Sequence, residues 1–130
     1  MPVLDLPNAY YDLPQGKLAN VVTCLEMLEA PQRSLVPFPD DLQLKRFSGT
    51  DLASFRDLFR AVGSDLMWFS RLIMKDEDLA AILGNPAIES YALLRDGKAL
   101  GLLELNFADL PNCELAFYGL VPSAIGKGLG

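Results

Sequence analysis

The residues best suited to chemistry stand near the end of the sequence, at positions 126–130, which read Gly-Lys-Gly-Leu-Gly. Glycines at alternate positions let the backbone approach a ligand closely and turn several amides towards one point. Such a nest binds phosphate or diphosphate, and Lys127 would add a positive charge at its rim. An ordinary glycine-rich turn is the alternative interpretation. A Walker loop is a poor match because no Gly-Lys-Ser/Thr follows, and a Rossmann fingerprint would need a βαβ unit.

Two carboxylates before this loop are candidates for acid–base chemistry. Glu114 opens the apolar stretch that precedes the loop, and Glu104 lies in the stretch before that. A carboxylate there is able to act as a general base that takes a proton from a nucleophile before it attacks. By strict alternation along a strand, Glu114, Ala116 and Tyr118 would share one face. The alternative for Glu114 is a solvent-facing acid, and we expect Glu104 to be a surface acid.

Composition removes several other classes of site. The 130 residues include no histidine, which excludes histidine-based triads and metal sites. The two cysteines are too few for a four-cysteine zinc site, and they suggest a reducing, cytoplasmic setting; we expect no metal. Eleven basic against 17 acidic residues argue against a nucleic-acid partner. No apolar run is long enough for a membrane span, so no membrane partner is expected.

The elements that must position these residues follow from the apolar pattern. The length suits one domain, and 51% apolar with 22% charged residues is typical of a globular chain. A strand, three helical segments and then three more strands predict an α+β fold with a mainly antiparallel sheet. In chain order we predict a strand at 42–47, a helix capped by Thr50 or Asp51 to about Val62, helical segments from Asp65 and from Asp76 to Leu83, and strands at 88–94, 99–107 and 113–120, with a hairpin turn at 95–98.

The first 41 residues differ from the rest. Prolines and Gly16 break up the beginning, and further prolines follow Leu28. Residues 17–28 contain a β-branched cluster around Val22 and predict one strand, although helical spacing of the apolar residues is a competing interpretation. We therefore divide the chain into an arm, residues 1–41, and a main domain, residues 42–130.

The segment 113–130 resembles the GNAT family of N-acetyltransferases. In that family the fourth strand of the sheet leads into a loop of pattern Arg/Gln-x-x-Gly-x-Gly/Ala, whose amides bind the diphosphate of acetyl-coenzyme A. Here ELAFYGLVP at 114–122 is similar to the strand, and IGKGLG at 125–130 is similar to the loop. Ile125 departs from the pattern, because it stands where the family has Arg or Gln. The order of elements over 42–130 matches as well, which implies a partial GNAT fold with helices after the first strand.

The resemblance implies an N-acetyltransferase that uses acetyl-coenzyme A as cosubstrate and acts on an unidentified amine. It implies that Glu114 is the general base and that a strand amide near Gly119 or Leu120 polarises the thioester carbonyl. It places the helical region around Trp68, Phe69 and Arg71 at the acceptor wall, although core packing is the alternative for its aromatic residues. The implied coenzyme-binding residues are Tyr118, Gly119, Leu120, Gly126, Lys127, Gly128 and Gly130.

A different expectation follows from the last residue of the sequence. Gly130 lies within the glycine loop, and the family's next helix and strands do not follow. On this interpretation the chain is a truncated, catalytically inactive fragment that serves as an interaction module. It would then self-associate as a homo-oligomer through an open sheet edge, because unpaired strand edges and apolar patches promote association.

Overall fold

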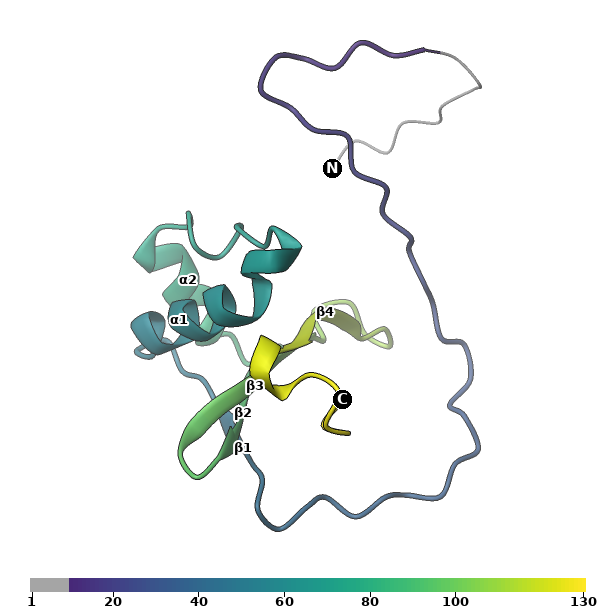
Figure 1. The fold of residues 1–130 in the computed structure, drawn as a ribbon, viewed down its shortest axis with the longest axis vertical. Helices are drawn as coiled ribbons and strands as arrows, with labels where there is room; N and C mark the ends of the chain where they lie inside the picture. Colours follow the sequence, from purple (N-terminus) through teal and green to yellow (C-terminus); the bar gives the residue numbers. More distant parts are fainter. Residues whose placement is uncertain (1–9) are drawn as a thin grey trace. The chain divides into compact units, whose positions relative to one another are not determined.

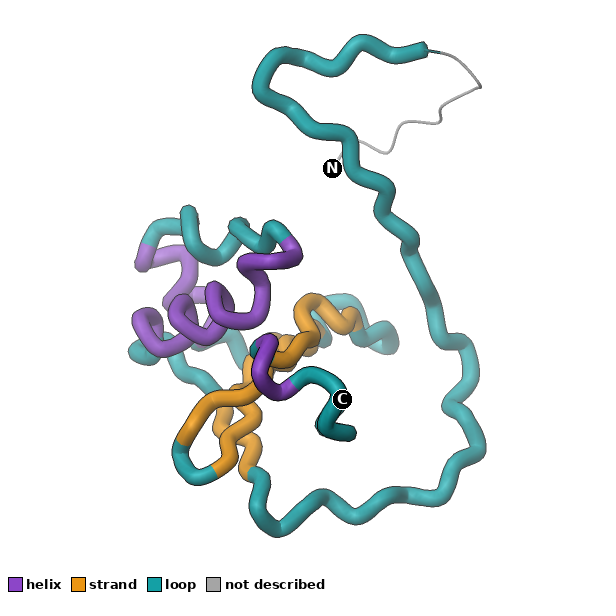
Figure 2. Tube along the Cα trace, in the orientation of Figure 1, coloured by secondary structure: helices purple, strands orange, loops and turns teal. Residues whose placement is uncertain are grey.

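The structure is a computed structural model that describes residues 10–130. The chain divides into two units, residues 1–35 and 36–130. The second unit holds a four-stranded antiparallel sheet in the order β1-β2-β3-β4, with the two α-helices on one face (Figures 1 and 2). This confirms the predicted α+β class. Its elements are β1 Gln43–Arg46, α1 Leu52–Gly63, the 3₁₀ helix η1 Ser64–Leu66, α2 Asp76–Leu83, β2 Ile88–Arg95, β3 Lys98–Asn106, β4 Glu114–Leu120 and the 3₁₀ helix η2 Pro122–Ala124.

Helix α1 supplies most of the core. Asp51 is its N-cap residue, and its buried face carries the predicted stripe at three- and four-residue spacing. Phe55 and Phe59 are fully buried and lie with ring centroids 5.9 Å apart. The sheet contributes Ala92 of β2 and Leu102 of β3 to the same core. The core therefore lies between the helices and one face of the sheet (Figure 1).

The second predicted helical segment is much shorter than expected. It is a single 3₁₀ turn that ends at Met67, whose φ of 55° is left-handed. The following N–H, that of Trp68, donates to the carbonyl of Gly63 at 3.0 Å, so the helix cannot continue. Residues 67–75 then form a loop between η1 and α2.

The hairpin between β2 and β3 is confirmed. Asp96 and Gly97 have φ values of 51° and 73°. Positive φ at both central residues is the geometry of the tight turn that Asp-Gly favours. Leu100 is an extra residue on β3 just beyond this turn, where the register with β2 shifts.

A second bulge, at Ala116, changes which residues of β4 share a face. The register pairs Phe117 with Glu104, whereas Glu114 pairs two residues further along β3. Residues paired across a sheet share a face, so Glu114 lies on the helix-covered face with Phe117. Tyr118 lies on the other face. The prediction of strict alternation along β4 was therefore wrong.

The arm contains no strand in its described part, residues 10–41, so the strand predicted at 17–28 was wrong. Residues 10–35 are all exposed, and Val21 keeps 93% of its surface. A strand needs a partner for its backbone groups, and β-branched residues alone do not provide one. Residues 1–9 of the predicted arm lie outside the described residues.

Within residues 10–130, no helix has both the length and the apolar character needed to cross a membrane.

Candidate functional site

The glycine loop follows β4 and η2 directly. Gly126 and Gly128 have φ values of 75° and 71°, a region that L side chains rarely adopt. A Cβ atom on either glycine would meet nothing within 4 Å, so the backbone is open on that side. Alternate left-handed residues leave successive amides accessible to an anion.

A cavity of about 450 Å³ lies between this loop and the β2–β3 hairpin. Lys127 lines it from the loop, and Arg95 and Lys98 line it from the hairpin. Sequence analysis singled out Lys127 but interpreted the other two as turn residues. Three cations thus meet at one cavity in a chain of net charge −6. The other lining residues are Asp96, Leu100, Ser123, Ala124 and Leu129.

The three cations are not equally compensated. The Nε of Arg95 lies 2.8 Å from Oδ2 of Asp41, an ion pair without hydrogen-bond geometry. Lys98 and Lys127 form no ion pair with any described residue. The carboxylate of Asp96 partly offsets them, but the lining remains cationic. Such a lining favours an anion.

A second, apolar cavity of about 190 Å³ adjoins the first at Leu129, which lines both. It brings together Tyr118, Gly119 and Leu120, the predicted coenzyme-binding residues of β4. A Cβ on Gly130 would lie 3.2 Å from the hydroxyl of Tyr118, so the loop returns to β4. The remaining lining residues are Phe38, Leu44, Leu93, Gly101, Leu102 and Leu103.

Glu114 stands apart from both cavities. It is exposed at the start of the seven-residue β4 and lines neither. Leu120 is at the other end of the strand, roughly 20 Å away at the usual strand rise. The structure therefore brings the loop, Lys127 and the end of β4 together, but not Glu114.

Glu104 is a buried acid. Its side chain is 1% exposed, and both carboxylate oxygens have partners. Arg71 Nη2 donates to Oε1 at 2.6 Å, and Ser90 Oγ donates to Oε2 at 2.9 Å. The expectation of a surface acid was wrong, because the register places Glu104 between Ser90 and Phe117 on the helix-covered face. No local signal in the sequence could reveal these partners.

The three residues predicted at an acceptor wall have different environments. Arg71 lies in the ion pair with Glu104, and its guanidinium sits 5.3 Å from the Phe117 ring centroid. The Trp68 ring is 5.0 Å from that of Phe117 and packs against the core. Phe69 is 63% exposed. Of these three residues, only Phe69 offers an exposed aromatic surface.

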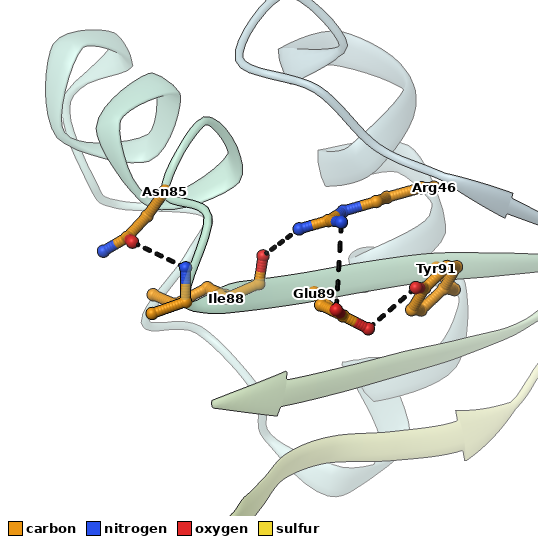
Figure 3. Close-up of polar contacts among 6 residues, drawn as sticks. Arg46, Asn85, Ile88, Glu89 and Tyr91 are labelled. Carbon is orange, nitrogen blue, oxygen red and sulfur yellow. Dashed lines mark hydrogen bonds and ion pairs between the residues drawn. The ribbon is translucent and has the colours of Figure 1, made fainter. Parts of the chain in front are cut away.

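A polar network joins β1 to β2 (Figure 3). Arg46 donates to the carbonyl of Ile88 at 3.0 Å and lies 3.8 Å from Glu89. The Tyr91 hydroxyl donates to Glu89 at 2.8 Å, and this hydrogen bond raises the pKa of Tyr91 above 10.0. The network lies on the first two strands and contributes to neither cavity.

No group of three His, Cys, Asp or Glu side chains among residues 10–130 is placed to hold a metal ion.

Comparison with known proteins identifies the fold. The chain matches no protein-family model and no curated protein. Among solved structures it is similar to an aminoglycoside acetyltransferase from an uncultured soil metagenomic sample, in complex with sisomicin. The TM-score is 0.57 at 18% identity, and the match covers 70% of this chain and 63% of that chain, which is less than two thirds. The α+β structure described above thus matches part of the GNAT acetyltransferase fold.

Proposed function

We propose that this chain carries the coenzyme-binding part of an N-acetyltransferase, which moves an acetyl group from acetyl-coenzyme A to an amine. The observation that carries the proposal is the open glycine loop beside a cationic cavity. A diphosphate suits both features, because backbone amides and positive side chains each bind phosphate oxygens. The similar fold of a known acetyltransferase supports the same class of reaction.

In this proposal the coenzyme spans the two adjoining cavities. The amides of Gly126, Gly128 and Gly130, with Lys127, hold the diphosphate. The pantetheine group of the coenzyme then lies in the apolar cavity beside Tyr118, Gly119 and Leu120. Leu129 lies where the two cavities meet. The diphosphate would then face the cationic lining and the less polar pantetheine group would face the apolar lining.

The transfer needs one base and one carbonyl activator. Glu114 lies at the other end of β4 from the carbonyl activator, so in this proposal the proton of the acceptor ammonium group reaches it through intervening water and is then released to the solvent. The amine nitrogen then attacks the thioester carbon, whose oxyanion is stabilised by a strand amide near Gly119 or Leu120. The C–N bond forms, the C–S bond breaks, and the second amine proton is transferred to the departing thiolate. The Glu114 carboxylate is accessible to water, because it is exposed and has no ion-pair partner among the described residues.

The acceptor in this proposal is a cationic amine. The similar acetyltransferase was solved with sisomicin, an aminoglycoside. The net charge of −6 would attract cations to the chain at low ionic strength. Release of free thiol from acetyl-coenzyme A in the presence of sisomicin tests this proposal, and the Glu114→Gln variant should lower the rate roughly a hundredfold. An unchanged rate in that variant would remove Glu114 as the base.

Calorimetric titration of acetyl-coenzyme A tests the binding site. Gly128→Ala should weaken binding about tenfold, because alanine disfavours the left-handed backbone by roughly 1–2 kcal/mol and the amides lose their orientation. Gly16→Ala is the matched control, since Gly16 has a φ of 79° with nothing within 4 Å and lies in the arm. Failure of the unmodified chain to bind acetyl-coenzyme A would overturn the proposal.

Self-association as an interaction module is the second candidate. Strand β4 is at the end of the sheet, and it exposes Leu115 at 57% and Tyr118 at 50%. An apolar strand at a sheet edge is a template for pairing with a second copy. Light scattering should then show a homo-oligomer that Leu115→Lys dissociates. A monomer at high concentration would contradict this candidate without affecting the first.

A further inference from the structure

The cationic cavity has two walls of different chemistry. One wall is the glycine loop, with its open backbone and Lys127. The other is the β2–β3 hairpin, where Arg95 and Lys98 are paired in register on either side of a two-residue turn. A diphosphate held by the loop would have the loop amides and Lys127 as its binding partners. The two cations of the hairpin would remain available to a second anion.

The hairpin cations are held in place independently of the loop. The ladder between β2 and β3 positions both backbones. The ion pair with Asp41 engages Nε of Arg95 and leaves the terminal nitrogens as donors. Lys98 has no ion-pair partner among residues 10–130. A preorganised guanidinium with a nearby ammonium matches the oxygens of a phosphate monoester.

We propose that Arg95 and Lys98 form a subsite for the 3′-phosphate on the ribose of the coenzyme, and that this subsite selects the phosphorylated donor over its 3′-dephospho form. The inference rests on the proposed function, because it assumes that the diphosphate lies at the glycine loop. It adds a specificity determinant on the hairpin, which the motif at 125–130 does not include.

The charge of the chain favours such a subsite and also provides an internal counter-test. A chain of net charge −6 repels a polyanion, so local cations must compensate. Asp96 lines the same cavity and opposes the phosphate. Its φ of 51° is a conformation that asparagine tolerates well, so Asp96→Asn keeps the turn and removes the repulsion.

The test is calorimetric titration of acetyl-coenzyme A and of 3′-dephospho-acetyl-coenzyme A into the whole chain. The phosphorylated donor should bind about tenfold more tightly, as charge-assisted hydrogen bonds to an anion allow. Lys98→Met should reduce that ratio to about threefold by weakening only the phosphorylated donor. Asp96→Asn should increase the ratio. Lys75→Met is the control, because Lys75 is exposed and lines neither cavity.

The outcomes separate the subsite from the proposed function. Equal binding of both donors by the unmodified chain would overturn the subsite and leave the acetyltransferase proposal intact. Equal weakening of both donors by Lys98→Met would assign Lys98 to the diphosphate and also overturn the subsite. Failure of either donor to bind would overturn the proposed function itself.

Discussion

Arg71 Nη2 lies 2.6 Å from Oε1 of Glu104, and the two side chains are only 16% and 1% exposed. This ion pair fastens the loop 67–75 to β3. Arg56 strengthens the attachment from α1, because it donates to the carbonyls of Met74 at 2.6 Å and Arg71 at 3.4 Å. Two arginines therefore hold the segment between η1 and α2 in place, Arg71 against the sheet and Arg56 against α1, in the region where the resemblance places the acceptor wall.

Breaking the buried pair should destabilise the fold strongly. Glu104→Gln leaves the buried guanidinium of Arg71 without its counter-charge, which costs about 3 kcal/mol in the free energy of unfolding. The double variant Glu104→Leu with Arg71→Met should recover most of this loss, because an apolar pair needs no desolvated charge. Urea unfolding measures both, with Glu26→Gln in the exposed arm as control. A double variant as unstable as Glu104→Gln would contradict this account of the pair.

Asp51 should make stability depend on pH in the acid range. The Ser48 hydroxyl and backbone N–H each donate to its carboxylate at 2.8 Å, and these bonds hold the pKa of Asp51 below 3.8. A lowered pKa in the folded state stabilises the fold above 3.8, and this contribution disappears as the pH falls through the folded-state pKa. The unfolding free energies of the unmodified chain and Asp51→Asn should therefore converge in acid. A difference that is constant with pH would contradict this.

The contribution of Tyr91 to stability should decrease as the pH rises, which is the opposite direction to that of Asp51. Its pKa is raised above 10.0, first by the hydrogen bond to Glu89, so the protonated hydroxyl is favoured in the fold. This contribution is present below pH 10.0 and is lost as the pH rises through the folded-state pKa. Phenolate absorbance of the chain minus that of Tyr91→Phe isolates this group. Glu89→Gln should shift its titration to lower pH, and an unshifted curve would exclude the assigned cause.

Gly119 should tolerate no larger residue. A Cβ there would lie 2.6 Å from Cγ1 of Val62, which is 5% exposed in the core. We expect Gly119→Ala to lower the free energy of unfolding by about 1–3 kcal/mol through overpacking. Val62→Ala should be less harmful in that background than in the unmodified chain, because it removes the clash. Thermal unfolding of the four chains measures this, and equal effects of Val62→Ala in both backgrounds would argue against the contact.

Local signals in the sequence predicted most elements. The apolar stripe of α1, the stop after Leu83 and the Asp96–Gly97 turn depend on neighbours within a few residues, so the sequence contains their causes. The strand expected at 17–28 failed for the complementary reason. Its composition suits a strand, but a strand forms only with a partner, and sequence pattern does not provide one.

In the candidate site, too, some residues could be predicted from local sequence and others could not. The sequence by itself determined the glycine loop and Lys127, because spacing alone dictates how alternate glycines expose amides. Only the tertiary structure decided that Arg95 and Lys98 complete the cavity and that Glu104 is a buried ion-pair partner. These relationships depend on strand register and on one-residue bulges. A single extra residue such as Ala116 moves the side chains that follow it to the opposite face of the sheet, and no pattern in the sequence indicates its position.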